Sequence, residues 1–519
     1  MRLHGQPGRG RNGSGGTTLT DRHVLVVGAG VGGLVAAALL AARGQRVTVL
    51  ERASVPGGKM REVRVGSAVM DAGPTVFTMR WVFDEIFEAA GDCFADRVAL
   101  RPAQVLARHA WADGSRLDLF ADLERSVEAI GAFAGAREAR AFRAFSARAC
   151  HVYRALERPY LRSARANPIQ LVRRAGLSGL AGLARISPFT TLWEALGEHF
   201  RDARLRQLFG RYATYSGSSP FLAPATLMLI AHVERDGVWL VEDGMHALAR
   251  ALAGLAQRHG ACLRYGCEVA EIEVAAGRAV AVRLAHGERV SADAVVLNAD
   301  CAALAQGLFG EACARAAGPV SPTERSLSAL TWCMHAHARG FPLVRHNVFF
   351  SDDYRAEFDD LFAQARLPSR PTVYVCAHDR DDRDERPSGA ERIMCLINAP
   401  ARADAGALAP AAIERCADAA FGLLARCGLQ VGDDEAPAAI AGPDQFSRLF
   451  PGSGGALYGR ATHGWNGAFQ RPGARSALPG LYLAGGSTHP GAGVPTSALS
   501  GRLASDAVLA DFGGTAREH

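Results

Sequence analysis

The feature that most constrains the fold of this chain is a glycine-rich turn between two apolar segments. Gly28, Gly30 and Gly33 match the pattern GxGxxG. Residues 24–27, which precede the turn, have the composition of a buried strand. Residues 34–42, which follow it, are rich in Ala and Leu and predict a helix. The pattern therefore predicts a strand that turns tightly into a helix.

The next residues complete a βαβ unit of the kind that binds a dinucleotide. Residues 47–50 predict a second strand, and Glu51 follows as an acceptor for a ribose hydroxyl. The turn lets a pyrophosphate approach the backbone, and the start of the helix offers N–H groups and a positive dipole end. A second GxGxxG at Gly8 has no strand before it and no helix after it, so we expect no nucleotide there.

A second glycine-rich turn lies far along the chain, at Gly485 and Gly486. A strand is predicted before it, and a helix is predicted after Pro495. The start of this helix can place its positive end near a ring system that becomes negative on reduction. This suits a flavin better than a nicotinamide, so we predict FAD rather than NAD as the cofactor.

Lys59 follows Gly57 and Gly58 and is the sole lysine among 58 basic residues. A compact ammonium differs from a planar guanidinium in the ligands it suits, so the position suggests contact with the flavin or its phosphates. The alternative is that one lysine survived by chance in an Arg-biased chain.

Charge and composition exclude several functions. The net charge is +6, and Arg is interspersed with Asp and Glu, which argues against a nucleic-acid surface. The 11 cysteines form no CxxC pair, so we expect no metal site. No apolar run reaches the roughly 18 residues that a membrane span needs. The apolar run at 222–232 is too short to span, and it is either core or a lipid contact.

The motifs together resemble the FAD-dependent carotenoid desaturase family of bacteria, which is related to amine oxidase-like flavoproteins. The resemblance is closest to the branch of 1-hydroxycarotenoid (hydroxyneurosporene) 3,4-desaturases of purple photosynthetic bacteria. The family motifs are the fingerprint at Gly28 with Glu51, Gly57-Gly58-Lys59, Asp71-Ala72-Gly73-Pro74-Thr75 and the turn from Gly485 to Pro495. The segments that favour the branch are 75–80, 210–215, 237–239 and 457–460.

The resemblance implies an α/β fold in which a discontinuous Rossmann-type FAD-binding domain joins an α+β substrate domain with a helical insert. A chain of 519 residues is too long for one core, which agrees with several domains. The expected parts are a disordered tail (1–22), the FAD-binding domain (23–85, 230–305 and 475–515), a helical and membrane-facing insert (86–229) and the substrate-binding domain (306–474).

The resemblance also implies a function. The enzyme would introduce the C3,4 double bond into acyclic 1-hydroxy or 1-methoxy carotenoids. Its partners would be a long apolar carotenoid, a membrane surface and an electron acceptor such as quinone or oxygen, with no nucleic acid. It would lie in the cytoplasm, peripherally on the inner or photosynthetic membrane. Polar residues within 326–337 and 453–460 are candidates for binding the polar end of the substrate.

Three alternatives to this function remain open. A phytoene desaturase or carotenoid isomerase shares the outer motifs. An amine or porphyrinogen oxidase would act on a polar substrate. A flavin-bound carotenoid carrier would show no turnover.

The candidate site residues follow from these motifs. His489, on the flavin-facing turn, is a candidate catalytic base, and the alternative is a turn residue that bonds to backbone. The chemistry needs only a weak base, and the sequence contains no nucleophile triad. The residues expected to bind FAD are Gly28, Gly30, Gly32, Gly33, Glu51, Gly57, Gly58, Lys59, Val269, Gly485, Gly486 and Val494.

Overall fold

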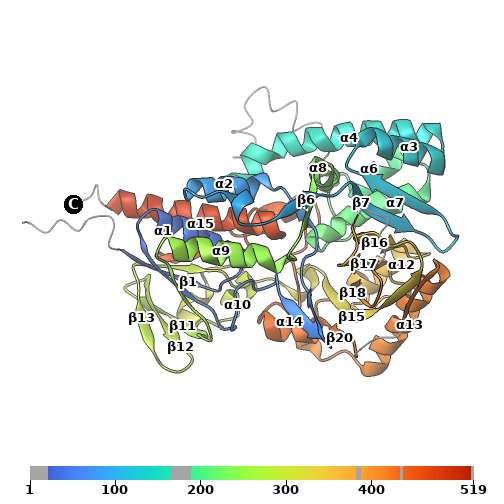
Figure 1. Cartoon of the computed structure of the whole chain (residues 1–519). Coiled ribbons are helices and arrows are strands. Elements are labelled where there is room, and N and C mark those ends of the chain that lie inside the picture. Colours follow the sequence, from blue (N-terminus) through green and yellow to red (C-terminus); the bar gives the residue numbers. More distant parts are fainter. Residues whose placement is uncertain (1–21, 165–186, 188, 382–386, 433–436, 516–519) are drawn as a thin grey trace, which may run out of the picture.

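The computed structural model describes residues 22–164, 187, 189–381, 387–432 and 437–515. The predicted tail 1–22 lies outside the described residues except for Arg22. Two sheets organise the molecule, one in each half of the view in Figure 1. No helix in the described part of the chain is long and apolar enough to span a membrane.

The first sheet is parallel, has five strands, and is built from three distant parts of the chain. Its order is β10 (Cys262–Arg264), β2 (Arg46–Leu50), β1 (His23–Val27), β14 (Ala294–Leu297) and β21 (Leu481–Leu483). Each of the three segments predicted for FAD binding supplies at least one of these strands.

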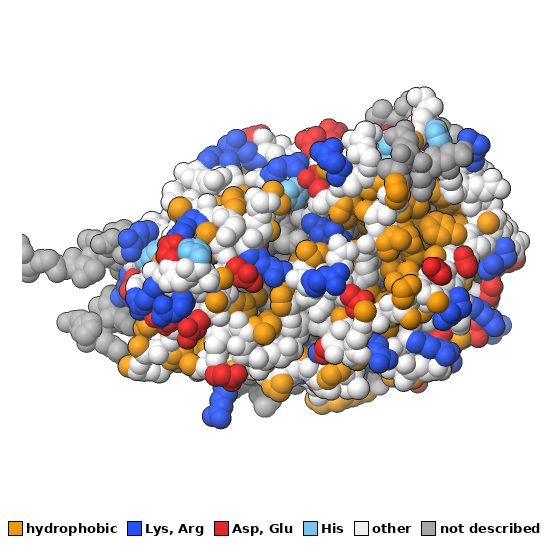
Figure 2. Space-filling model, turned by 90° about the horizontal axis from the view of Figure 1, so that it is seen from below, with side chains coloured by type: hydrophobic (Ala, Val, Ile, Leu, Met, Phe, Trp, Pro, Cys, Tyr) orange, Lys and Arg blue, Asp and Glu red, His pale blue; other side chains and the backbone are white. Residues whose placement is uncertain are grey.

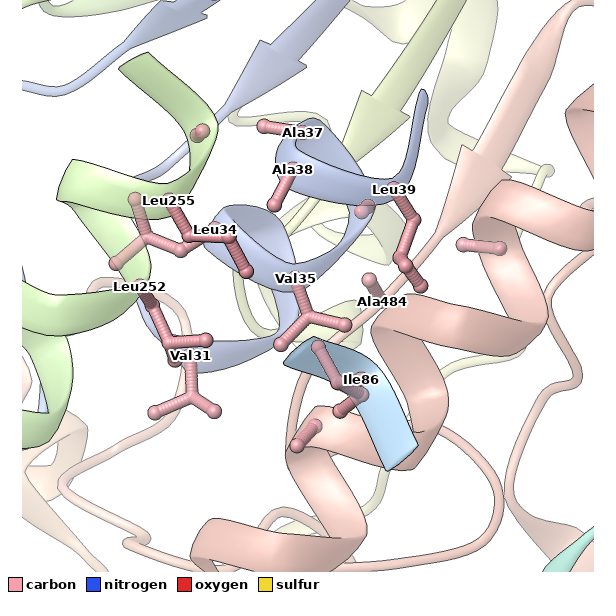
Figure 3. Close-up of a cluster of buried hydrophobic side chains, with 14 of the residues drawn as sticks. Val31, Leu34, Val35, Ala37, Ala38, Leu39, Ile86, Leu252, Leu255 and Ala484 are labelled. Carbon is pink, nitrogen blue, oxygen red and sulfur yellow. The ribbon is translucent and has the colours of Figure 1, made fainter. Parts of the chain in front are cut away.

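The two faces of this sheet are both buried, which explains the unbroken apolar composition of β1. Val24 and Val26 pack toward helices, whereas Leu25 and Val27 pack toward a small antiparallel sheet. Figure 3 shows the helical side, where side chains of the central helix meet those of its neighbours. The helices are α1 (Val31–Ala42), α2 (Trp81–Ala89), α9 (His246–Arg258) and α15 (Val494–Thr515), and the small sheet is β11 (Val269–Ala275), β12 (Arg278–Leu284) and β13 (Arg289–Ser291).

The second sheet has eight strands, six of which come from the region 306–474. Its order is β19 (Leu429–Gly432), β15 (Ser328–Gly340), β18 (Glu391–Ala399), β17 (Val373–Ala377), β16 (His346–Phe349), β7 (Val105–Ala110) and β8 (Arg116–Phe120), with β20 (Ala439–Ala441) beside β15. Helices on this side are α12 (Tyr354–Phe358), α13 (Pro410–Arg426) and α14 (Pro443–Leu449).

The helical prediction for residues 86–229 is wrong at its start. Strands β7 and β8 extend the second sheet through a parallel pairing of β7 with β16. Leu117 and Leu119 are buried and alternate with less buried neighbours, which is the strand period that the Ala- and Arg-rich composition obscured. The remaining described part of this region is helical: α3 (Leu123–Ala134), α4 (Ala136–Leu156), α6 (Leu192–His199), α7 (Ala203–Gly210) and α8 (Leu229–Asp236).

Shorter elements connect the two halves. They are β3 (Glu62–Val65) paired with β4 (Ala68–Asp71), the order β5 (Phe77–Thr78), β9 (Val238–Val241) and β6 (Leu100–Pro102), and the helices α10 (Cys301–Ala305) and α11 (Glu311–Ala314).

Candidate active site

A cavity of about 1040 Å³ runs from the glycine-rich turns to the second sheet. This volume reaches the top of the range of roughly 300–1,000 Å³ that single-ligand pockets occupy. All but one of the residues predicted to bind FAD line this cavity. The exception is Gly33, and the candidate base His489 is also not among the described lining residues. Those that line it are Gly28, Gly30, Gly32, Glu51, Gly57, Gly58, Lys59, Val269, Gly485, Gly486 and Val494.

Close packing explains why two positions in the first turn are glycine. A Cβ on Gly33 would overlap the carbonyl oxygen of Gly28, so this glycine serves the packing of helix against strand. A Cβ on Gly32 would lie 2.8 Å from the backbone nitrogen of Gly485 and 3.0 Å from the carbonyl oxygen of Ser497. The two glycine-rich turns, which are more than 400 residues apart, therefore touch.

Asn298 joins these two turns and was missed as a site residue from the sequence. Its Nδ2 donates to the carbonyl oxygen of Gly28 at 3.2 Å, and its Oδ1 lies 2.7 Å from where a Cβ on Gly485 would be. It also lines the cavity. The available signal was its place at the polar end of an apolar strand.

Glu51 is fixed by backbone at the end of β2. One carboxylate oxygen accepts from the N–H of Ala29 at 2.7 Å, and the other accepts from the N–H of Ala53 at 2.8 Å. The residue is 9% exposed and lines the cavity. Each oxygen keeps a lone pair for a ribose hydroxyl, since a carboxylate offers about four acceptor sites.

Lys59 is half-buried in the wall of the cavity. Its Nζ donates to the carbonyl oxygen of Leu457 at 2.7 Å and lies 5.3 Å from the centre of the Phe450 ring. Burial lowers the pKa of Lys59, and the nearby carboxylate of Asp300 opposes that effect. The single hydrogen bond leaves the ammonium with donors that can face a ligand.

The residues present fit FAD. The helix α1 begins after Gly30 with no side-chain capping bond, so its first N–H groups are free to meet a phosphate. One carboxylate oxygen of Asp300, a cavity residue, is buried without a hydrogen-bond partner. An unpaired buried oxygen of this kind calls for a donor, which a bound cofactor can provide.

His489 lies beside the cavity rather than in its wall. Its Nε2 is 2.9 Å from the carbonyl oxygen of Tyr160, and its ring lies edge-on to the Tyr160 ring at 4.8 Å. The residue is 3% exposed. The structure therefore favours the alternative in which His489 bonds to backbone and orders the turn, and it does not support direct contact with a substrate.

The rest of the cavity wall is largely apolar and comes from the helical region and the second sheet. Leu227, Leu229 and Ile230, from the run at 222–232, line it, whereas Met228 is fully buried. That run is thus part core and part cavity wall. Phe189 and Trp465 also line the cavity, are 79% and 47% exposed, and have ring centres 5.7 Å apart.

The geometry defines a flavoprotein, and the comparisons agree. The chain belongs to the flavin-containing amine oxidoreductase family, whose model matches residues 31–509. It is an oxidoreductase, and its cofactor is FAD. A solved structure of putrescine oxidase with putrescine has a TM-score of 0.58 at 15% identity, covering 94% of this chain and 99% of that one.

Within this family the chain is similar to the hydroxyneurosporene desaturases. It is 54% identical to that of Rubrivivax gelatinosus over 96% of this chain and 95% of the relative. It is 46% identical to that of Cereibacter sphaeroides over 95% and 99%. These relatives confirm the predicted resemblance to the carotenoid desaturases.

Proposed function

We propose that the enzyme introduces the C3,4 double bond into acyclic 1-hydroxy carotenoids, and into their 1-methoxy forms. The observation that carries this proposal is one cavity that joins the FAD-binding turns to a long apolar wall ending in a few buried polar groups. The similarity to hydroxyneurosporene desaturases over nearly the full length supports it.

The reaction removes two hydrogens from adjacent carbons. FAD supplies the acceptor for one of them as hydride, and the other leaves as a proton. A second acceptor, quinone or oxygen, then takes up the electrons. A cation next to a polyene is delocalised, so the neighbouring proton is acidic and a weak base suffices. The task of the chain is to hold the substrate against the flavin and to exclude water.

The regions that bind FAD and substrate in this proposal are those of the predicted domains, with one change. We infer that residues 23–85, 230–305 and 475–515 bind FAD and that 306–474 bind the substrate. The region 86–229 covers the cavity and also contributes strands β7 and β8 to the substrate sheet.

The substrate enters from a membrane. Burial of a long hydrocarbon from water, at about 0.8 kcal/mol per CH₂, would exceed any real affinity. Transfer from lipid to an apolar cavity avoids this difficulty because the two surroundings are similar. The exposed rings of Phe189 and Trp465 give the cavity an apolar edge where this transfer can occur. Peripheral binding to the inner or photosynthetic membrane would serve this step.

The test is expression in cells that supply either phytoene or a 1-hydroxy carotenoid, with product analysis by absorbance and mass. A product that absorbs at longer wavelength and has lost two hydrogens should appear from the hydroxylated precursor. Efficient conversion of phytoene with the hydroxylated carotenoid untouched would replace this proposal with the phytoene desaturase alternative. The absence of any product from either precursor would favour a carrier.

A further inference from the structure

A group of polar side chains lies in the cavity wall beyond the apolar part. It contains Arg211, just after α7, Glu234 in α8, and Tyr354 at the start of α12, and all three line the cavity. Glu234 is 7% exposed and accepts hydrogen bonds from the hydroxyls of Tyr212, at 2.7 Å, and Tyr215. Burial raises the pKa of Glu234. Because of these two hydrogen bonds, each carboxylate oxygen of Glu234 already accepts from a protein donor.

The hydroxyl of Tyr354 has no such partner. The residue is 7% exposed, and its Oη is buried without a hydrogen bond. Its ring is held firmly, with ring centres 5.1 Å from Phe358 and 6.0 Å from Trp193. A buried hydroxyl left unpaired costs about 1–3 kcal/mol, so an unpaired one in a cavity wall points to a ligand.

Arg211 offers further donors at the same place. Its guanidinium lies 5.6 Å from the centre of the Tyr215 ring and 5.5 Å from that of Tyr374. Among the described residues no carboxylate forms an ion pair with it within 4.0 Å. A guanidinium has five N–H donors and no acceptor, so what it seeks from a ligand is an oxygen. A Cβ on Gly210, the residue before Arg211, would lie 3.4 Å from the Tyr354 ring, so the chain at Arg211 passes beside that tyrosine.

The polar group is close in structure to the flavin end of the cavity. The hydroxyl of Thr75 forms a hydrogen bond with the Tyr374 hydroxyl at 2.7 Å. Thr75 is two residues after Gly73, which packs against Lys59 so closely that a Cβ on Gly73 would overlap the carbonyl oxygen of Lys59. Tyr458, which lines the cavity, follows Leu457, whose carbonyl oxygen accepts from Lys59. An oxygen held here would thus lie near the reacting carbons.

We propose that Arg211 and Tyr354 bind the terminal oxygen of the substrate and so select oxygenated carotenoids. This inference rests on the proposed function, since only two carbons, C1 and C2, separate the oxygen on C1 from C3. The oxygen accepts from the guanidinium and bonds to the tyrosine hydroxyl. A site built this way can reject an analogue without the oxygen by about 10⁴-fold, because its own polar groups would stay unpaired. The candidates that the sequence suggests for binding the polar end of the substrate lie within 326–337 and 453–460, and these ranges contain neither Arg211 nor Tyr354. Tyr458, which belongs to the second range, lines the same cavity.

The experiment compares Tyr354→Phe, Arg211→Met and the wild-type holoenzyme on a 1-hydroxy carotenoid and on the same carotenoid without the oxygen. Tyr354→Phe should lower kcat/KM for the hydroxylated substrate by about tenfold, and Arg211→Met by about 10- to 100-fold. Neither should lower kcat/KM for the analogue. Binding titrations followed by carotenoid absorbance should show the same loss in Kd. Tyr482→Phe, in β21 and bonded to Asp511, is the control that should leave the substrate ratio unchanged.

Stability separates recognition from a structural role. Because the Tyr354 hydroxyl has no protein partner, Tyr354→Phe should keep the Tm of the parent. Arg211→Met also removes the contacts of the guanidinium with the Tyr215 and Tyr374 rings and can lower stability, so Tyr354→Phe is the decisive variant. An unchanged preference for the hydroxylated substrate in Tyr354→Phe would overturn the inference while leaving the proposed function intact. A wild-type enzyme that ignores the hydroxylated substrate would instead defeat the proposed function.

Discussion

At the scale of single residues, the position of Lys59 allows a direct test of why a lysine stands there. The Nζ lies between the Leu457 carbonyl and the Phe450 ring, and the residue is half-buried in the cavity wall. Lys59→Arg keeps the charge but places a larger planar group in a packed wall, so it should reduce flavin content about tenfold or slow flavin reduction. The measurement is the ratio of flavin absorbance to protein after dialysis. Arg64→Lys, at an exposed position of strand β3, is the matched control. Equal flavin content in both variants would show that the lysine at position 59 survived by chance.

Buried histidines in the second sheet predict how stability depends on pH. Burial lowers the pKa of His109 from 6.5 to about 3, and that of His378 likewise to about 3. Between these values the unfolded state binds a proton that the folded state does not, so the free energy of unfolding falls as the pH falls from 6.5 toward 3. Each such histidine contributes a slope of about 1.4 kcal/mol per pH unit.

Removing one of these groups should flatten the pH dependence by that amount. His109→Asn keeps a donor for the Leu117 carbonyl, to which the Nδ1 of His109 lies at 3.1 Å. Urea denaturation across the window should give a slope smaller by about 1.4 kcal/mol per pH unit, and His378→Asn should behave alike. Parental slopes in both variants would show that these histidines titrate normally in the folded protein.

At the scale of elements, the close packing of helix α1 against strand β1 predicts which glycine tolerates no methyl group. Gly33→Ala would drive its Cβ into the carbonyl oxygen of Gly28, which should cost about 3 kcal/mol of unfolding free energy and lower flavin content. Gly513→Ala, in α15, meets no atom within 4 Å and should be neutral or stabilising by about 0.5–1 kcal/mol. Urea denaturation of both proteins checks this, and equal stability would show that β1 and α1 can move apart.

These elements also show which parts of the fold and of the candidate site could be predicted from the sequence. The turn at Gly28, the strand at β1 and Glu51 were predictable because local pattern and tertiary role coincide there. Strands β7 and β8 were not, since they are short and lie before a long Arg- and Ala-rich helical region, and their place in the sheet comes from the distant pairing of β7 with β16. Asn298 stood at the polar end of a predicted strand, but its role and that of Tyr354 depend on chain segments brought together only by folding. For His489 the sequence left two roles open, and the structure favours the second because its Nε2 lies at the distant Tyr160 carbonyl.

At the scale of the whole molecule, the proposed entry of the substrate from a membrane predicts an apolar opening of the cavity at the protein surface. Hydrophobic side chains gather on the part of the face in Figure 2 that lies away from the termini. Of the exposed large hydrophobic residues, Phe189, Trp465 and Leu308 also line the cavity, and the first two are aromatic. Ile440, in β20, is 49% exposed and is not among the described lining residues, so it provides a matched control. If these rings form the apolar edge of the cavity, the transfer of the substrate from lipid should depend on Phe189 and Trp465, whereas the desaturation step itself should not.

The variants Phe189→Ser and Trp465→Ser should therefore lower desaturation of a carotenoid supplied in lipid vesicles. Burying each ring in lipid is worth about 2 kcal/mol, or roughly 30-fold in partitioning to the vesicle. Flotation of the protein with vesicles should fall in parallel, while turnover of the same carotenoid in detergent micelles should stay within about twofold of the parent, since the apolar wall and the flavin end are unchanged. Ile440→Ser should leave both activities as they are. Equal losses in vesicles and micelles would mean that the two rings shape the cavity itself rather than its opening to the membrane.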